Sequence, residues 1–418
     1  MFHFTLRIKK SFLNCKKNAM KITFILIGLF SLYACGDKNV KREAGVIHLN
    51  PDEAQTLVLS DFFDHYEVRT FHGVLYSILL SFKRCDDLFV ADLYGNPEGR
   101  LFVFNSQGDS LCRLGSSGRG PGEYLHLTEY YIDKNQNVVL FDGIKYVKYS
   151  LDGQLISDRI IEVKPPDAGI MQHVLNDSLL VFELSPLCTF SSQFFDKKYL
   201  EKRRSAIETG YKLNLLSIKD SSVQRTYFPY KACVDLYISD FSYIKDDTLC
   251  YFNTFDNCLY RVSEDTVVPR YYFDRGPYTT WTTIEEYEKT RRFREFGSIK
   301  FDETDRYIIG SYTFKNKSYN FIYNKSTDQT YNFARQINDD ILEVNSSKYF
   351  SRWNIDDQYL SISIPPQLFI ETIGAKKESM EADQWEIYKQ QHRALLDAYE
   401  TIDDESSDPI IISYHFKK

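Results

Sequence analysis

The sequence predicts an all-β fold, a β-propeller of six blades, on three observations. A short turn of acidic or amide residues followed by an apolar β run occurs six times, and most of these units continue into a second run and a second polar turn. Aromatic residues make up 16% of the 418 residues, a content that suits strands. A final β run ends the chain, as the closure of a ring of blades requires.

The repeated units recur every 40 to 70 residues or so, a spacing typical of propeller blades. One small sheet cannot bury both of its faces, so each unit must stack on its neighbours around an axis. The β runs with their preceding turns are 86–90, 135–140, 176–181, 246–251, 305–309 and 356–360.

The first 34 residues read as a signal peptide. Basic residues lead into the apolar run 22–30, which is shorter than the roughly 20 residues that a spanning helix needs. Cys35 follows Ala34 and precedes Gly36, which resembles the lipobox of bacterial lipoproteins. That resemblance implies acylation of Cys35, with palmitate among the lipids. Translation begins at Met1 or at Met20.

These boundaries divide the chain into a signal peptide (1–34), a lipid-anchored tether (35–45) and a single propeller domain (46–418). Removal of the signal peptide leaves 45 Lys and Arg against 58 Asp and Glu, a net charge of −13. An acidic surface repels phosphate backbones, so we expect no nucleic-acid partner. No later apolar run is long enough to span a membrane, so we expect the protein to be attached to it by the lipid alone. We also expect a monomer.

Two segments carry helical periodicity. In residues 378–402, apolar side chains including Trp385, Tyr388 and Leu395 fall at steps of three and four. This predicts a C-terminal amphipathic helix that packs on the outside or at one mouth of the β core, in preference to a partner-binding helix. Residues 283–296 carry a shorter pattern of the same kind. The run 410–416 then predicts a closing strand that completes one blade together with the N-terminal strands.

The most constrained stretch is the loop from Gly118 to Tyr124, with the sequence Gly-Arg-Gly-Pro-Gly-Glu-Tyr. Three glycines at alternate positions permit positive φ, and Pro121 fixes one φ. The spacing fits neither nucleotide-binding glycine motif, and no helix follows it. The loop is therefore predicted to be a fixed corner between the first two blades, tied to a neighbour by Arg119 or Glu123.

Taken together, the Cys35 lipobox, the loop 118–124, the six β units and the terminal strand resemble the six-bladed β-propeller lipoproteins of anaerobic gut bacteria. These proteins are similar in fold to NHL-repeat propellers, and most have no assigned activity. The resemblance covers nearly the whole mature chain. It implies the fold and the envelope location much more than a function.

No motif for catalysis is present, and the eight histidines are scattered singly. Cations beside aromatic or acidic residues are instead candidates for a glycan- or peptide-binding surface. The candidate ligand-binding residues are Arg119, Glu123, Arg275, Trp281, Arg352 and Trp353. With so many aromatic residues, core packing is the competing interpretation of these pairs.

Carboxylates at strand ends could converge on the axis of a propeller and bind Ca²⁺. The candidates are Asp92, Asp142, Glu183 and Asp274; their alternative role is to cap turns or pair with Lys and Arg. No other cofactor is predicted. No Cys-x-x-Cys pair is present, although Cys250 and Cys258 could face each other across a hairpin as a disulfide.

These observations favour an envelope lipoprotein, most consistent with the outer membrane, that binds a protein, peptide or glycan and carries out no catalysis. The alternative is a propeller hydrolase or lactonase with a divalent metal in the central channel. A third reading is a structural member of an envelope complex. Convergence of several carboxylate, Asn or His side chains on one point of the channel, at metal-ligand distances, would distinguish the enzyme from the binding protein.

Overall fold

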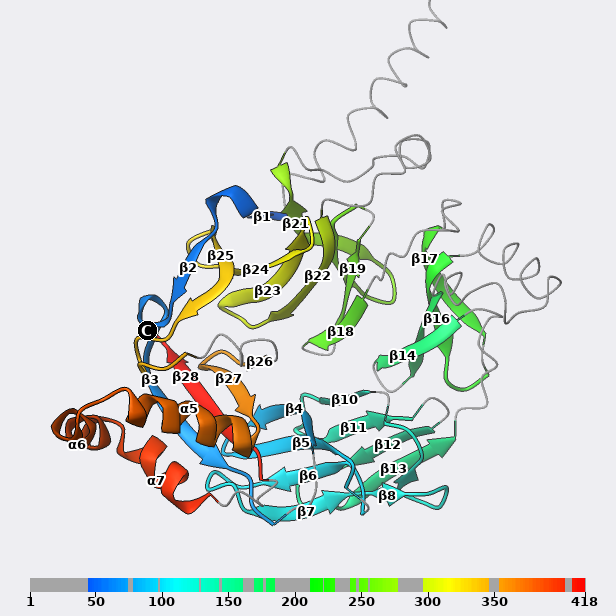
Figure 1. The fold of residues 1–418 in the computed structure, drawn as a ribbon. Helices are drawn as coiled ribbons and strands as arrows, with labels where there is room; N and C mark the ends of the chain where they lie inside the picture. The colour runs from blue at the N-terminus through cyan, green and yellow to red at the C-terminus, as the bar shows by residue number, and fades with distance from the viewer. Residues whose placement is uncertain are drawn as a thin grey trace, which may run out of the picture.

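The computed structural model confirms the six-bladed β-propeller (Figure 1). It describes residues 44–73, 78–96, 98–127, 129–142, 145–160, 169–175, 178–184, 211–220, 222–229, 241–245, 248–254, 256–276, 296–345, 353–402 and 408–417. Six sheets of four or five strands surround a common axis, and each is one blade. All six predicted turns lie between the first and second strands of a blade.

The first three blades are four-stranded antiparallel sheets formed by consecutive strands. Blade I contains β4 (Ile78–Cys85), β5 (Leu88–Tyr94), β6 (Leu101–Phe104) and β7 (Ser110–Leu114). Blade II contains β10 (Glu129–Ile132), β11 (Val138–Phe141), β12 (Lys145–Tyr149) and β13 (Leu155–Ile160). Blade III contains β14 (Gly169–Leu175), β15 (Leu179–Leu184), β16 (Tyr211–Ser217) and β17 (Val223–Pro229).

The other three blades each include a strand from the N-terminal segment. Blade IV contains β18 (Phe241–Lys245), β19 (Thr248–Asn253), β20 (Cys258–Val262), β21 (Val267–Asp274) and β1 (Gly45–His48). Blade V contains β22 (Phe296–Glu303), β23 (Tyr307–Phe314), β24 (Lys317–Asn324), β25 (Gln329–Asn338) and β2 (Gln55–Val58). Blade VI contains β26 (Trp353–Ile355), β27 (Tyr359–Ile364), β28 (Ile410–Phe416) and β3 (Phe63–Thr70).

The N-terminal segment holds three successive blades together. β1 pairs parallel with β21 and β2 pairs parallel with β25, each as an added outer strand. The 3-10 turns Pro51–Glu53 and Leu59–Asp61 follow these two strands. β3 then pairs antiparallel with β28, so both ends of the propeller complete blade VI. This confirms the predicted closing strand and removes an exposed edge.

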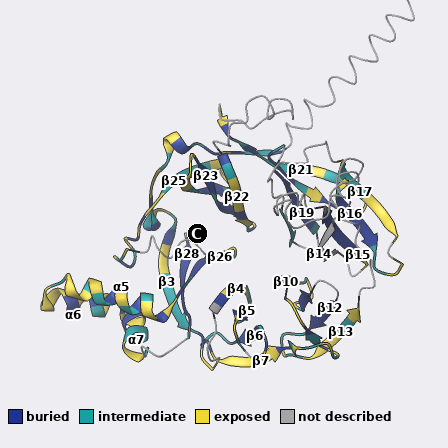
Figure 2. Cartoon of the chain, turned by 45° about the vertical axis from the view of Figure 1, so that its right-hand side comes forward, coloured by how far each residue is buried: buried dark blue, intermediate teal, exposed yellow. Residues whose placement is uncertain are grey.

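Each blade packs its two faces against its two neighbours, as the period of two along a strand requires. On β19, Leu249 and Tyr251 belong to the cluster shared with blade III. Cys250 and Phe252 belong to the cluster shared with blade V. Figure 2 shows such buried positions along strands throughout the ring. Burial on both faces explains why the second strand of each unit is a continuous apolar run.

The same alternation corrects the disulfide hypothesis. Cys258 pairs with Asn253 and Cys250 pairs with Arg261, so the two cysteines lie on opposite faces of the hairpin. Both are buried, and neither forms a disulfide. The spacing between the two cysteines suggested facing positions, but a register that centres the turn on residues 254–257 separates them.

The predicted C-terminal helix is present but was wrongly drawn as one element. Two helices, α6 (Ala382–Gln391) and α7 (Arg393–Thr401), meet at His392, whose φ of −117° and ψ of 40° interrupt the helix. A further helix, α5 (Pro366–Glu378), precedes them and was not predicted. It begins directly after the last residues of β27, with Pro366 in the first turn, where proline is tolerated.

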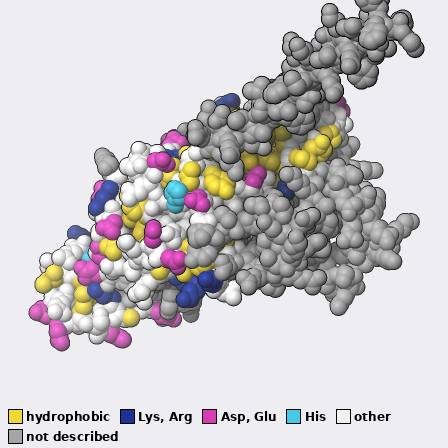
Figure 3. Space-filling view, turned by 90° about the horizontal axis from the view of Figure 1, so that it is seen from above, with side chains coloured by type: hydrophobic (Ala, Val, Ile, Leu, Met, Phe, Trp, Pro, Cys, Tyr) yellow, Lys and Arg dark blue, Asp and Glu magenta, His cyan; other side chains and the backbone are white. Residues whose placement is uncertain are grey.

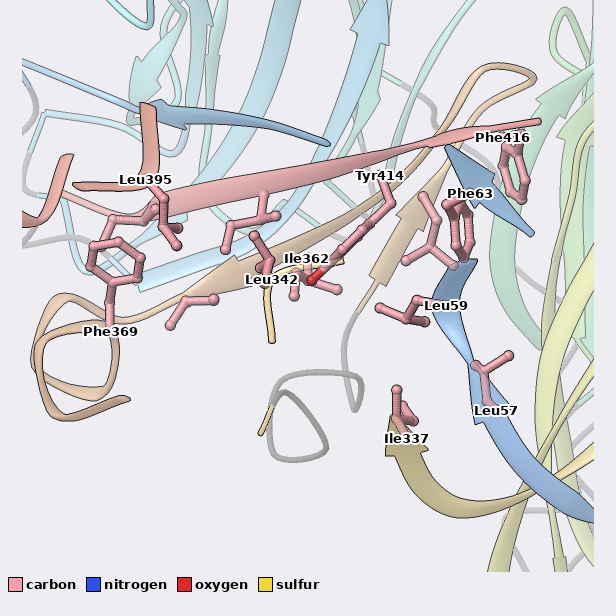
Figure 4. Packing of buried hydrophobic residues seen from close by; sticks show 14 of the residues in the cluster. Leu57, Leu59, Phe63, Ile337, Leu342, Ile362, Phe369, Leu395, Tyr414 and Phe416 are labelled. Atoms are coloured by element: carbon pink, nitrogen blue, oxygen red, sulfur yellow. The ribbon is translucent and has the colours of Figure 1, made fainter. Parts of the chain in front are cut away.

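The three helices extend the largest hydrophobic cluster away from blade VI. In Figure 4, Phe369 and Leu395 from the helices lie at one end of this cluster. Phe63 and Phe416 lie toward its other end, beside residues of β2. Each such side chain stabilises the fold by roughly 1.5–3 kcal/mol when buried. The helices therefore pack against the outside of the β core, as expected, and their buried side chains join its largest hydrophobic cluster.

Two other expectations concern a helix at 283–296 and a membrane-spanning segment. The helix expected at 283–296 lies outside the described residues except for Phe296, which begins β22. Among the described residues, no helix has the length and apolar character to cross a membrane.

Candidate functional site

The first strand of every blade lies nearest the axis of the ring (Figures 1 and 2). Each of these strands places a polar or indole side chain within a few residues of its following turn. We name this set the axial residues: Lys83, Glu129, His173, Ser242, Asp302 and Trp353, from blades I to VI in order. They form two groups, each drawn from three adjacent blades.

The first group is a chain of three side chains across blades II, III and IV. His173 Nε2 lies 2.9 Å from Ser242 Oγ, and His173 Nδ1 lies 2.7 Å from Glu129 Oε2. The second contact has the distance of an ion pair but not the direction of a hydrogen bond. The imidazole is almost completely buried, with 1% of its side chain exposed, whereas 31% of the Glu129 side chain is exposed. An acid, a base and a hydroxyl thus stand in series.

The second group joins blades I, V and VI. Asp302 is exposed to solvent although it lies on an innermost strand, and protein surrounds it on most sides. Burial therefore raises the pKa of Asp302, while the charge of Lys83 and a hydrogen bond from the Trp353 side chain partly oppose this shift. Asp302 is thus a carboxylate that protein surrounds on most sides but that solvent still reaches.

The neighbours of Lys83 fix its position. Its Nζ lies 5.5 Å from the centroid of the Tyr130 ring, a cation–π distance. Tyr130 is held in turn by its hydroxyl, which donates to the Val90 carbonyl at 3.1 Å. On the other side, Asn354 Oδ1 accepts from the Phe82 N–H at 3.4 Å and connects blades VI and I.

The loop 118–124 is the predicted corner between blades I and II, and its polar groups are largely used within the protein. Glu123 Oε2 accepts from the Gly120 N–H at 2.7 Å, so Glu123 ties the loop to itself. Only Gly122 of the three glycines has a positive φ, +70°. A Cβ at Gly118 or Gly120 would instead contact the Glu123 carboxylate, at 2.1 and 2.9 Å respectively. Arg119 is exposed.

A buried lysine, Lys145, binds the backbone of the loop. Lys145 Nζ donates to the carbonyls of Gly120 and Glu123 at 2.6 and 3.0 Å, and lies 2.8 Å from Asp158. Asp158 also accepts from the Gly122 N–H at 2.5 Å. Of the two sequence candidates in this loop, Glu123 is therefore occupied by the corner, and only Arg119 is free to meet a ligand.

The carboxylates proposed for a metal belong to separate blades and contact other partners. Asp92 forms a bidentate pair with Arg100, with N–O distances of 2.8 and 2.6 Å. Asp142 accepts from the Leu125 N–H at 3.3 Å, and Asp274 lies 3.0 Å from His48 Nδ1. Glu183 is a buried residue of β15 in blade III. Among the described residues, no three His, Cys, Asp or Glu side chains are placed to hold a metal ion.

The remaining candidates are distributed differently. Arg275 is buried, 1% exposed, with its guanidinium carbon 5.4 Å from the centre of the Phe296 ring, so it belongs to the interior. Trp353 is half-buried on β26 and is an axial residue. Trp281, Arg352 and Cys35 lie outside the described residues.

A hollow of about 850 Å³ among the described residues follows residues 335–345 at the end of β25. A second hollow, of about 360 Å³, lies between blades IV and V and is lined by Lys245, Thr248, Cys250, Arg261, Arg270, Tyr271, Asp305 and Lys325. We name the second the basic hollow. Its cations stand out because acidic side chains are scattered over the described surface, as on the face in Figure 3.

Sequence analysis missed five of the six axial residues. It considered that side chains from different blades could converge on the axis, but the carboxylates that it named lie on or after second and outer strands. A usable signal was present: Lys83, His173, Ser242 and Asp302 each precede a repeated turn by three or four positions. Those positions belong to the innermost strand.

Comparison with known proteins supports the fold. Residues 45–414 match the family model described as "Domain of unknown function (DUF4934)". A solved structure from Bacteroides fragilis, of a protein described as exported, is similar with a TM-score of 0.57 and 15% identity, over 90% of this chain and 100% of that one. At this identity the likeness shows the fold alone. No curated protein matches the chain.

Two further solved structures are more distant. Virginiamycin B lyase from Staphylococcus aureus has a TM-score of 0.34 and 10% identity, over 67% of this chain and 78% of that one. The extracellular domain of a one-component system from B. thetaiotaomicron has a TM-score of 0.33 and 12% identity, over 72% of this chain and 32% of that one. Both scores are too low to bear on the function.

Proposed function

This chain belongs to the DUF4934 family, and we propose that it is an exported, lipid-anchored propeller that binds a glycan at its axis. The observation that carries the proposal is the exposure of Asp302 and Lys83 on innermost strands. An axis filled by packing alone would not leave charged groups in contact with water at the centre of the molecule.

A glycan suits this set of side chains better than a peptide or protein. Trp353 supplies a half-buried indole face, and its hydrogen bond to Asp302 fixes the ring beside a carboxylate. Sugars are recognised by aromatic faces combined with a few fixed polar groups that meet their hydroxyls. Asp302 accepts such hydrogen bonds and Lys83 donates them.

The glycan proposal is tested with residues 36–418, which contain every described strand. We expect this protein to bind members of an oligosaccharide array, and Trp353→Ala and Asp302→Asn to weaken the binding. Asp265→Asn is the matched control, because Asp265 is 79% exposed in an outer turn. Binding of peptides only, or an equal loss in the control variant, would rule out the axial glycan site.

The proposed anchor is the acyl-modified Cys35, with the outer membrane as its location. The support is the lipobox-like sequence around Cys35, which follows a basic and then apolar N-terminal segment. Metabolic labelling with an alkyne palmitate analogue should mark the wild-type protein in membrane fractions. Cys35→Ser should lose both the label and the membrane association; unchanged labelling would show that the lipid is elsewhere.

A hydrolase is the second candidate, and one specific observation favours it: the Glu129–His173–Ser242 chain. In such a reaction Ser242 Oγ attacks an ester carbonyl while His173 Nε2 accepts its proton. The proton then passes to the departing alcohol, and water releases the acid and restores the serine. Glu129 would orient the imidazole and stabilise its charge. This candidate replaces the channel metal of the sequence-based alternative with a nucleophile.

A fluorophosphonate probe separates the two candidates. If the hydrolase reading is right, the probe labels Ser242, and Ser242→Ala and His173→Gln abolish the label. Ser298→Ala is the control, since Ser298 is an exposed serine on the innermost strand β22. If the wild-type protein stays unlabelled, the hydrolase candidate is wrong, and Glu129, His173 and Ser242 only connect neighbouring blades.

A further inference from the structure

The basic hollow collects four cations from blades IV and V. Lys245 ends β18, Arg261 lies near the end of β20, Arg270 lies on β21 and Lys325 follows β24. Among the described residues that line the hollow, Asp305 supplies the one carboxylate, which lies 2.7 Å from Lys245 Nζ. This composition contrasts with the acidic mature chain.

A buried carboxylate holds two of the cations in place. The Glu303 side chain has no exposed surface, and Arg270 contacts it with both terminal nitrogens, at 3.0 and 2.7 Å. Lys325 Nζ and the Tyr243 hydroxyl each donate to it at 2.6 Å. Burial alone would raise the pKa of Glu303, but these donors and charges hold it below the ordinary value. Glu303 is therefore ionised and fixes the two cations at the rim.

The charges in the hollow do not cancel among the described residues. Four cations face two carboxylates, Glu303 and Asp305. Arg261 makes its recorded side-chain contact with the Thr248 hydroxyl, at 3.1 Å, and with no described carboxylate. Asp246 and Asp247, in the turn before Thr248, lie outside the described residues. A positive hollow with a fixed floor is suited to a phosphate or another compact anion.

The first residue of β1 lies beside this hollow. Gly45, the first residue of β1, is paired with Tyr271, which lines the hollow. β1 runs parallel to β21 and therefore away from the turns that follow β18 and β20. The N-terminal end of β1, at Gly45, thus points toward the end of the propeller that holds the hollow. The ten residue-to-residue steps from Cys35 to Gly45 span at most about 35 Å.

We propose that the basic hollow binds the phosphate of an anionic lipid headgroup in the membrane that receives the anchor. This inference rests on the proposed lipid anchor, which holds the hollow within one tether length of the bilayer. Tyr271 adds a side chain of the kind that favours the membrane interface. Headgroup binding would orient the propeller, because a single flexible tether leaves its rotation unrestrained.

Vesicle flotation tests the proposal with unacylated residues 36–418, so the result does not depend on Cys35. Vesicles of phosphatidylcholine with 30 mol% phosphatidylglycerol, roughly the charge of an anionic membrane surface, should retain the protein, and pure phosphatidylcholine should not. Lys245→Gln with Arg261→Gln should weaken retention ~25-fold, at about fivefold per charge. Arg270 and Lys325 are left in place because they neutralise the buried Glu303.

The matched control is Lys317→Gln with Arg113→Gln, which removes the same charges from β24 and β7, near the opposite ends of their blades. Retention lost in the hollow variant and kept in the control supports the proposal. Equal retention by both vesicle types, or equal loss in both variants, overturns it. A rise in Tm with inorganic phosphate but no flotation also overturns it, because the ligand is then a free anion. Failure of Cys35 labelling would leave this result unchanged and would instead remove the anchor.

Discussion

The loop 118–124 and the axial residues differ in how their polar groups are used. In the loop, Glu123 caps its own backbone and Lys145 binds two of its carbonyls. At the axis, Asp302 and Lys83 remain in contact with solvent. The loop is the most conspicuous stretch of the sequence, whereas the axial residues are inconspicuous single letters spread over six blades.

The difference separates two kinds of signal. A cluster of glycines and a proline indicates that the backbone must adopt a particular conformation. In this protein that conformation is a corner in which the Glu123 carboxylate packs against Gly118 and Gly120. A binding site in a propeller requires convergence, which depends on the register of distant strands. In this protein the most conspicuous motif, the loop 118–124, therefore has an architectural role. The candidate site becomes visible only when the arrangement of the blades is known.

The largest expected effect is that of Lys145→Met on the corner. The substitution leaves the Asp158 carboxylate, 16% exposed, without its cation, and breaking a buried pair costs roughly 3 kcal/mol or more. Urea unfolding measures the loss. Adding Asp158→Leu should restore part of it. A loss below about 1 kcal/mol would show that Lys145 does not support the loop.

Gly122→Ala should cost somewhat less. Its φ of +70° disfavours any side chain, and the added Cβ would lie 2.9 Å from the Tyr149 hydroxyl. We expect a loss of about 2 kcal/mol with ligand binding retained. Ser117→Ala, on the short strand β8 (Ser116–Ser117) next to the loop, is the control. Normal stability combined with lost binding would turn the corner into a functional site.

Asp302→Asn should have a small stabilising effect that depends on pH. Because burial raises the pKa of Asp302 above its unfolded value of 3.8, the folded state loses stability as pH rises from 3.8 through the raised pKa. The variant escapes this cost, so its Tm should exceed that of the wild type at pH 7. The gap should close as pH falls toward 3.8. A gap that widens in acid would contradict the assignment.

Arg119→Ala should have the smallest effect. Arg119 is exposed, and substitution of such a surface residue usually changes stability by less than about 0.5 kcal/mol. Thermal unfolding and oligosaccharide binding should both match the wild type. A clear loss of binding alone would bring the loop back as a ligand contact.

Much of the fold could be predicted from the sequence because it depends on local patterns. The turns at 86–87 and 356–357 and the run 410–416 follow from periodicity and turn chemistry. Helix α5 was not predicted, because few of its residues are buried, among them Phe369 and Ile373, and they leave only a weak helical pattern in the sequence. The break at His392 was also missed, because an unbroken apolar stripe hides a change in backbone direction.

The site was less predictable, for a physical reason. Trp353 was identified because it is an aromatic residue next to the cation Arg352. Its position on the innermost strand of a blade played no part in that choice. Glu129, His173 and Ser242 come together only through the packing of β10, β14 and β18. A single sequence contains the strand pattern but not the distance between side chains from three blades.

The most direct test of the central claim is the calorimetric affinity of the best array oligosaccharide for the wild type, Trp353→Ala and Arg119→Ala. We expect Trp353→Ala to weaken the affinity about tenfold or more, the size expected for an aromatic anchor, and Arg119→Ala to leave it unchanged. The reverse pattern, with Trp353→Ala unchanged and Arg119→Ala impaired, would contradict an axial site and place ligand binding at the glycine-rich corner.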